Sequence, residues 1–220
     1  MITENVREIL YPLGFIATFC FTLRFAIQWL YSEYKGKSLV PRSFWIVSMI
    51  ANVLLFLHGS IQFQYHVSLV QGCNSILAWR NINLMDTKEK QYTYRFTVML
   101  LSSMIALVTA YFWLQAGQAS WFRVPATPWQ HAPEQVSALW HFFGFTGMLL
   151  FASRFWIQWY QAEKMTESYL SETFWWLSIV SCVIILIYTV KIGDVVNGIG
   201  PGLGLIPYIR NLMLLKAKPT

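Results

Sequence analysis

The sequence contains few charged residues. They make up 12% of its 220 residues, about half of the roughly 25% that is usual in soluble domains. Hydrophobic residues reach 56% and aromatic residues 17%. A soluble domain needs a charged, solvated surface, so this composition excludes one. It favours an all-α protein that crosses a membrane several times.

Cysteine and histidine are also scarce, and neither is grouped. Cys20, Cys73 and Cys182 lie far apart with no CxxC spacing, and the four histidines form no close pair. No Ser-His-Asp, Cys-His or paired-carboxylate arrangement converges on one point either. The sequence therefore predicts no metal, no cofactor and no enzymatic activity.

The net charge of +6 raises the question of a nucleic-acid partner. Proteins that bind nucleic acid gather their basic residues on one water-facing surface. Here the lysines and arginines lie mostly in short connections between apolar segments, which is the topological bias of membrane proteins. No nucleic-acid partner is predicted.

Seven apolar segments are long enough to cross a bilayer as helices. They cover residues 9–31, 43–61, 67–85, 96–114, 136–160, 173–190 and 195–215. Between the fourth and fifth, residues 115–135 are rich in proline and tryptophan, which predicts an irregular segment at the membrane interface. Five tryptophans are predicted to be interfacial anchors: Trp29, Trp45, Trp159, Trp175 and Trp176.

The first three segments recur as the last three. Residues 10–84 align without a gap with residues 140–214, at an offset of 130, and 19 of the 75 pairs are identical. Shared apolar composition would not place Arg, Gln, Glu and Arg-Asn in one register. We therefore expect two three-helix repeats, 1–85 and 136–220, joined by a linker helix and an outer loop in 86–135.

The odd number of helices in each repeat fixes the predicted orientation. One extra crossing between the repeats makes them parallel, related by an axis along the membrane normal. Most basic residues fall in the first, third and fifth connections and in the C-terminal tail. By the positive-inside rule, the N-terminus is predicted to be periplasmic and the C-terminus cytoplasmic.

Two arginines lie deep in apolar segments at equivalent positions of the repeat. Inserting an arginine at the centre of a membrane helix costs about 2.5–3.5 kcal/mol on insertion scales. Two of them at equivalent positions therefore indicate a functional or structural role. A guanidinium can bind a phosphate through two parallel hydrogen bonds. A glutamine four residues after each arginine shares its helical face. The predicted phosphate-binding residues are Arg24, Arg154, Gln28 and Gln158.

A structural role for the same arginines is the alternative. Each can be tied to the glutamate of its own repeat, to backbone carbonyls or to lipid phosphate. Glu33, Glu163 and Asp194 are predicted to be supporting acidic residues, although Asp194 can also form a surface pair with Lys191.

Further polar residues in the helices are candidate contacts for a sugar or headgroup. Interhelical hydrogen bonding is the alternative for the amides, and neutralisation of a helix C-terminus or an anionic leaflet for the arginines. The candidates are Asn52, Gln71, Asn74, Arg80, Asn81, Arg210 and Asn211.

The repeated pattern resembles a known family. Arg-Phe-x-x-Gln-Trp is followed by a glutamate, by Phe44-Trp45-x-x-Ser48 and by a late Arg-Asn pair, and it resembles the lipid A biosynthesis N-terminal family. The resemblance covers both repeats, and the family is distantly similar to PQ-loop and SWEET transporters. In this sequence Gln64 occupies the first-repeat position that corresponds to Asp194.

The resemblance implies a bacterial inner-membrane protein of lipid A or envelope glycan modification. The predicted function is a flippase for a sugar carried on polyprenyl phosphate, with membrane lipids and glycosyltransferases of the same pathway as further partners. The alternatives are a non-catalytic accessory subunit of a glycosyltransferase and a SWEET-like carrier of a small solute. Disaccharide synthase activity is not expected, because no synthase domain follows the last segment.

Overall fold

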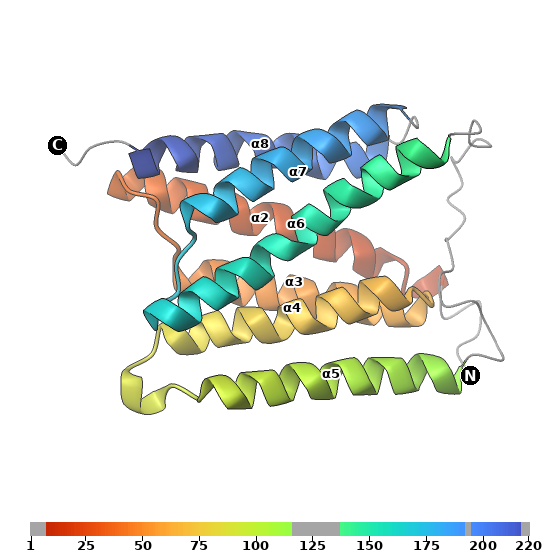
Figure 1. Ribbon diagram of the computed structural model, residues 1–220, viewed down its shortest axis with the longest axis horizontal. Coiled ribbons are helices and arrows are strands. Elements are labelled where there is room, and N and C mark those ends of the chain that lie inside the picture. Colours follow the sequence, from red (N-terminus) through yellow and green to blue (C-terminus); the bar gives the residue numbers. More distant parts are fainter. Residues whose placement is uncertain (1–7, 116–136, 192–194, 217–220) are drawn as a thin grey trace. The chain divides into compact units, whose positions relative to one another are not determined.

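The computed structural model describes residues 8–115, 137–191 and 195–216, and within these ranges the chain is helical with no β-strand (Figure 1). Its helices are α2 (Pro12–Lys35), α3 (Arg42–Ile61), α4 (Tyr65–Leu84), the 3-10 turn η1 (Lys88–Lys90), α5 (Tyr94–Leu114), α6 (Ala138–Met165), α7 (Glu172–Lys191) and α8 (Val195–Lys216). Each predicted segment is confirmed as an α-helix, with ends that agree to within five residues. The predicted interfacial segment lies outside the described residues from position 116 onward.

Four helical segments are long and apolar enough to cross a membrane. They are Pro12–Lys35, Arg42–Ile61, Lys88–Leu114 and Glu172–Lys191. The other three helices are α4, α6 and α8, and in α4 four polar side chains are buried: Ser68, Arg80, Asn81 and Asn83. Composition and length thus identify a helical, membrane-associated protein.

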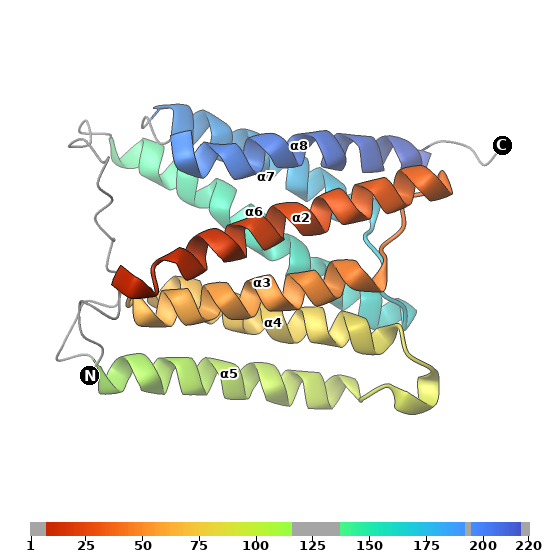
Figure 2. The same cartoon turned by 180° about the vertical axis from the view of Figure 1, so that it is seen from behind.

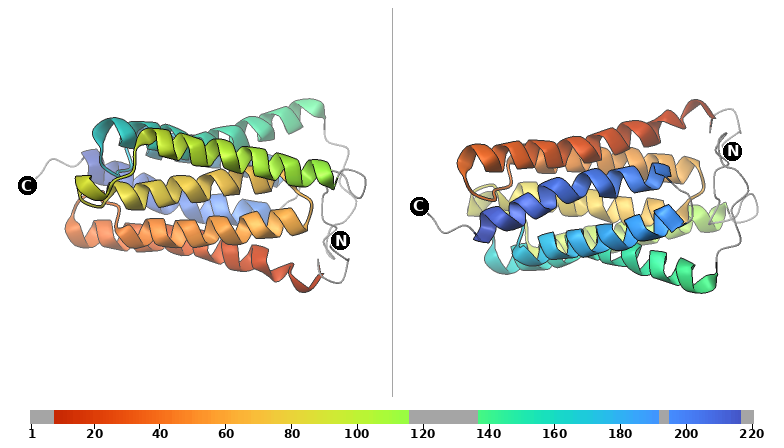
Figure 3. Two further views of the ribbon diagram at one scale, coloured as in Figure 1. Left: turned by 90° about the horizontal axis from the view of Figure 1, so that it is seen from below. Right: turned by 90° about the horizontal axis from the view of Figure 1, so that it is seen from above.

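The chain divides into two compact units, and the division falls within α2 and α3. The first unit comprises Met1–Leu23 and Trp45–Thr127. In it α4 and α5 lie side by side (Figure 3). Its core contains Phe63, Val108 and Phe112, and the Tyr65 hydroxyl is 3.0 Å from Thr109 Oγ1. Aromatic and aliphatic packing, together with this polar contact, joins the two helices.

The second unit comprises Arg24–Phe44 and Pro128–Thr220. In it α7 packs against both α6 and α8 (Figure 3). The second half of α2 runs beside α8, to which it is joined by side-chain hydrogen bonds (Figure 2). Two glycines of α6 allow a close approach to α7: a Cβ atom at Gly144 would lie 2.5 Å from Tyr188 Cγ, and one at Gly147 would lie 2.7 Å from Ile184 Cγ2.

Gly144→Ala is therefore expected to destabilise the second unit. The added methyl group would overlap the Tyr188 ring, and overpacking of this kind costs about 1–3 kcal/mol. Thermal unfolding in detergent micelles would show a lower midpoint. Gly200→Ala is the matched control, because a Cβ there meets nothing within 4 Å. An unchanged midpoint for Gly144→Ala would mean that α6 and α7 can separate at no cost.

Candidate functional site

The two repeat-related arginines lie close together inside the second unit. Arg24 comes from α2 and is 4% exposed, while Arg154 comes from α6 and is 0% exposed. Both guanidinium groups lie over the same ring, with their Cζ atoms 4.9 and 5.0 Å from the centroid of Phe155. The structure thus brings together the two residues that the repeat pattern singled out.

Aromatic rings surround both guanidinium groups. Arg154 Cζ is 3.6 Å from the centroid of the Phe151 ring and 5.4 Å from that of Tyr208. Such cation–π contacts are worth about 0.5–2 kcal/mol each, most when water is excluded. We call this group the arginine–aromatic cluster: Arg24, Arg154, Phe25, Phe44, Phe151, Phe155, Phe174 and Tyr208.

Arg154 has fewer hydrogen bonds than its donors could make. Its Nη1 donates to Ser178 Oγ at 3.1 Å, and Ser178 in turn donates to the Phe174 carbonyl at 2.7 Å. Its Nε and Nη2 are buried and have no acceptor among the described residues. A buried donor without a partner costs about 1–3 kcal/mol, and more when it is charged. The cluster therefore holds a cation whose hydrogen-bonding capacity is only partly used.

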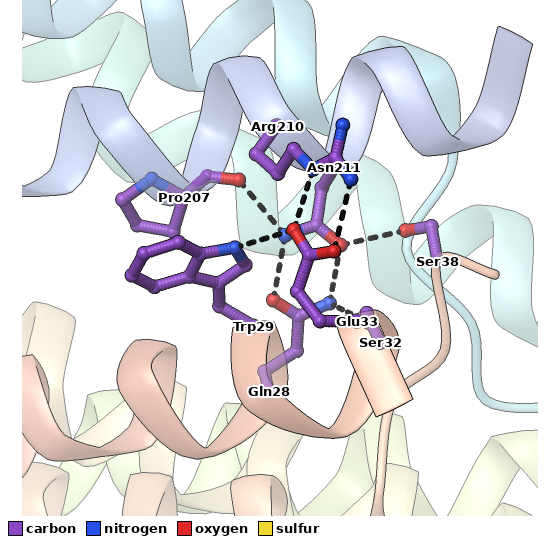
Figure 4. Close-up of polar contacts among 8 residues, drawn as sticks. All are labelled: Gln28, Trp29, Ser32, Glu33, Ser38, Pro207, Arg210 and Asn211. Atoms are coloured by element: carbon purple, nitrogen blue, oxygen red, sulfur yellow. Dashed lines mark hydrogen bonds and ion pairs between the residues drawn. The ribbon is translucent and has the colours of Figure 1, made fainter. Parts of the chain in front are cut away.

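A polar layer lies one helical turn beyond Arg24, between α2 and α8 (Figure 4). Gln28 and Asn211 are both 0% exposed and pair through two amide hydrogen bonds of 2.6 and 2.9 Å. Asn211 also donates to the Pro207 carbonyl and accepts from Ser38, and Gln28 also donates to Ser32 Oγ and the Leu39 carbonyl. The structure thus engages Gln28 and Asn211 in joining helices.

An ion pair follows closer to the end of α2. Arg210 of α8 donates from Nε and Nη2 to the two carboxylate oxygens of Glu33, at 2.5 and 2.9 Å, and Trp29 Nε1 donates to the same carboxylate at 2.9 Å (Figure 4). The two ionic side chains are 42% and 33% exposed. Because exposed pairs contribute little to stability, we regard this pair chiefly as an orienting contact.

Parts of this pattern recur in the second repeat. Trp159 donates to Glu163 at 2.8 Å, as Trp29 does to Glu33. Gln158 donates to the Tyr169 carbonyl at 3.0 Å, as Gln28 does to the Leu39 carbonyl at 3.1 Å. Glu33 is bound by Trp29 and by Arg210 of the second repeat, Glu163 accepts from Trp159, and Arg154 donates to Ser178.

The other candidates belong to the first unit or fall outside the described residues. Arg80 is buried and donates to Asn83 Oδ1 and to the Tyr92 carbonyl, both at 2.7 Å, and Asn81 donates to the Leu77 carbonyl. Gln71 Oε1 and Asn74 Oδ1 are buried and accept no hydrogen bond from the described chain. The remaining candidates are Asn52, which is 3% exposed, and Asp194, which lies outside the described residues.

Sequence reasoning missed three residues of the site. Trp175 was expected at the membrane interface but is 0% exposed, and its Nε1 has no acceptor in the described part of the chain. Tyr208 is 3% exposed and packs on Trp175, and Ser178 is fully buried beside Arg154. The identical pairs Trp45/Trp175 and Ser48/Ser178 in the repeat were an available signal.

The chain matches one protein family twice. The family model described as the lipid A biosynthesis N-terminal domain matches residues 13–83 and again residues 143–213. The chain belongs to this lipid A biosynthesis family. The two matches have the same offset as the internal repeat, and helix α5 lies between them.

Curated relatives place the family match in longer proteins. The chain is 33% identical to a lipid-A-disaccharide synthase of Chlamydia felis over 99% of the chain, and 34% identical to one of Chlamydia pneumoniae over 97%. In both cases the match covers 35% of the relative, so the chain spans about a third of the length of these proteins. No solved structure shows a significant match.

These relatives contradict two predictions made from the sequence. The predicted flippase, with its accessory-subunit and carrier alternatives, is wrong, because the relatives are named as disaccharide synthases and not as transporters. The prediction of no enzymatic activity is contradicted for the same reason. A helical membrane scaffold can serve many activities, so the distant resemblance to transporter families did not identify a function.

Proposed function

We propose that the chain is a membrane-embedded part of lipid-A-disaccharide synthesis, in which it holds a lipid-linked sugar substrate of the glycosyl transfer. The similarity to lipid-A-disaccharide synthases along almost the whole chain supports this role. A reaction that makes a lipid-borne disaccharide joins sugars that carry acyl chains. Helices that accommodate such chains within the bilayer, close to the reacting sugars, suit that requirement.

The arginine–aromatic cluster is the observation that carries the substrate-binding role. Its two guanidinium groups share the Phe155 ring and are surrounded by uncharged side chains. Like charges repel more strongly in an apolar surrounding than in water. An anionic group on the substrate would relieve that repulsion and accept hydrogen bonds from the arginines. In this proposal Arg24 and Arg154 bind the anionic group, while Gln28 and Gln158 hold the adjoining helix ends.

The membrane arrangement is part of the same proposal. We propose seven crossings, as two parallel three-helix repeats over 1–85 and 136–220 that are joined through α5. The two family matches at one offset support the duplication. The basic residues near the C-terminal ends of α2, α6 and α8, namely Lys35, Lys164 and Lys216, favour placing those ends in the cytoplasm of a bacterial inner membrane.

Depleting the protein from the bacterium that produces it would test this role. Mass spectrometry of extracted lipids would measure the lipid A disaccharide and its acylated monosaccharide precursors. We expect the disaccharide to fall and the precursors to accumulate. Wild-type chain should restore the ratio, while Arg154→Met should leave it about tenfold lower, as expected for the loss of a charged hydrogen-bond donor.

Lys164→Met provides the matched control. It removes one positive charge from the same helix, α6, at an exposed position that contacts Tyr160. It should restore the lipid ratio fully. A disaccharide-to-precursor ratio that does not change on depletion would exclude the proposed role.

A further inference from the structure

The arginine–aromatic cluster contains more buried N–H donors than the described chain supplies acceptors for. Arg154 Nε and Nη2 and Trp175 Nε1 are all buried without an acceptor there. The Tyr208 ring connects them: its centroid is 5.4 Å from Arg154 Cζ and 5.9 Å from the centroid of Trp175. Buried donors are paired in the great majority of proteins, so two on Arg154 and a third on a residue that packs against the same tyrosine indicate a ligand with several acceptor oxygens.

The positive charge of the cluster indicates an anionic ligand. Two guanidinium groups face rings that carry no negative charge: five phenylalanines and Tyr208. A phosphate monoester carries a charge of about −1.5 to −2 at pH 7 and has three terminal oxygens. A phosphodiester or a carboxylate carries a single negative charge and two such oxygens. A monoester therefore matches both the charge and the number of donors best.

The position of the cluster along its helices indicates how the ligand reaches it. Lys35 and Lys164 lie eleven and ten residues beyond Arg24 and Arg154, which is about 15 Å along a helix. Both lysines contact exposed tyrosines, Tyr34 and Tyr160, and tyrosine and lysine are typical of a membrane interface. If the helices cross the bilayer as proposed, the cluster lies at the depth of the acyl chains. A lipid-borne phosphate reaches that depth more readily than a free ion.

The polar layer separates the cluster from the basic end of α2. Gln28 and Asn211 satisfy each other there and are fully buried. Their amides are engaged in the protein, so the ligand contacts are assigned to the arginines and to Trp175. Gln28 and Asn211 therefore join the helices, while the arginines and Trp175 contact the ligand.

We propose that Arg154, Arg24 and the indole N–H of Trp175 bind the phosphate monoester of a lipid. This inference rests on the proposed function for its membrane setting and deepens it by naming the ligand class and a third binding residue. Trp175 becomes a specificity-determining residue and not an interfacial anchor.

Native mass spectrometry of the full chain, released from nanodiscs, would test this inference. The probes are phosphatidic acid as the monoester, phosphatidylglycerol as the diester, phosphatidylcholine as the zwitterion, and inorganic phosphate as a free competitor. We expect phosphatidic acid to be retained in preference to the other two lipids, and not to be displaced by millimolar phosphate. Arg154→Met should weaken its retention about tenfold or more, and Trp175→Phe about three- to tenfold.

Two further variants keep the result interpretable. Arg154→Lys preserves the charge but not the forked donor geometry, so we expect an intermediate loss. Lys164→Met should retain phosphatidic acid as the wild type does. Equal retention of phosphatidylglycerol, displacement by inorganic phosphate, or full retention by both Arg154→Met and Trp175→Phe would overturn the inference. Such a result would leave the lipid-ratio measurement on depleted cells unaffected, so the two proposals can fail separately.

Discussion

Arg154→Met is expected to make the ligand-free protein more stable. The side chain is 0% exposed, two of its nitrogens lack acceptors in the described chain, and a second guanidinium shares the Phe155 ring. Because both Cζ atoms lie within 5.0 Å of one ring centroid, the two charges are at most about 10 Å apart, and at an effective dielectric constant of about 20 they repel by at least about 1.7 kcal/mol. Methionine fills much of the same volume without a charge, and replacing buried ionic groups by apolar ones often stabilises a protein by about 1–4 kcal/mol.

The ring contacts of Arg154 act against this gain. Its Cζ lies 3.6 Å from the Phe151 ring centroid, and that interaction would be lost. We therefore expect a net rise in the free energy of unfolding of about 1–2 kcal/mol, from the balance of these terms. Unfolding in SDS, followed by circular dichroism, measures it. Lys164→Met, at an exposed position of the same helix, should change it by less than about 0.5 kcal/mol.

A fall in stability would assign Arg154 to the scaffold. In that case the rings and Ser178 would offset the charge completely, and the recurrence of the arginine in both repeats would have a structural reason. A rise, together with the loss of lipid retention, would instead mean that the chain tolerates an unfavourable buried charge for the sake of its ligand. The unfolding free energy and the lipid retention, measured on the same variant, together distinguish a structural role of Arg154 from a ligand-binding role.

The helices could be predicted from the sequence because they depend on local patterns. Apolar runs long enough to span a bilayer specify helices wherever they fall, and each of the seven expected segments is an α-helix in the described part of the chain, with ends within five residues of the expected positions. The family model recovered the same offset between the two halves. Segment length, hydrophobicity and internal identity carry this information without any knowledge of tertiary contacts.

The partners of the polar residues could not be predicted in the same way. Gln28 shares a helical face with Arg24, which suggested a common ligand, but its amide is engaged by Asn211, 183 residues away. Glu33, one of the predicted supporting acidic residues, binds Arg210 of α8, 177 residues away. Contacts between distant helices depend on how the helices pack, and spacing within one helix does not encode that. The predicted function was wrong for a related reason, because a helical scaffold does not specify the chemistry of the sites that it carries.

Asn211→Leu is expected to destabilise the second unit strongly. Asn211 makes two amide hydrogen bonds with Gln28 and one with Ser38, and both amides are 0% exposed. The substitution leaves the Gln28 carbonyl oxygen buried without the donor that Asn211 supplied. An unsatisfied buried group costs about 1–3 kcal/mol, and hydrogen bonds between membrane helices reach about 1.7 kcal/mol. We expect a loss of about 2 kcal/mol in unfolding free energy, measured by SDS titration.

The double variant Gln28→Leu with Asn211→Leu distinguishes a lost pair from a lost shape. When both partners of a buried hydrogen bond become apolar groups of similar size, the change can be nearly neutral. Gln28→Leu alone should destabilise much as Asn211→Leu does, and the double variant should recover most of the loss, giving a coupling energy of about 1–3 kcal/mol. Met213→Leu, at a position 56% exposed on the same helix, is the neutral control. Additive losses in the double variant would mean that the two amides act independently, and that α2 and α8 are held together by packing alone.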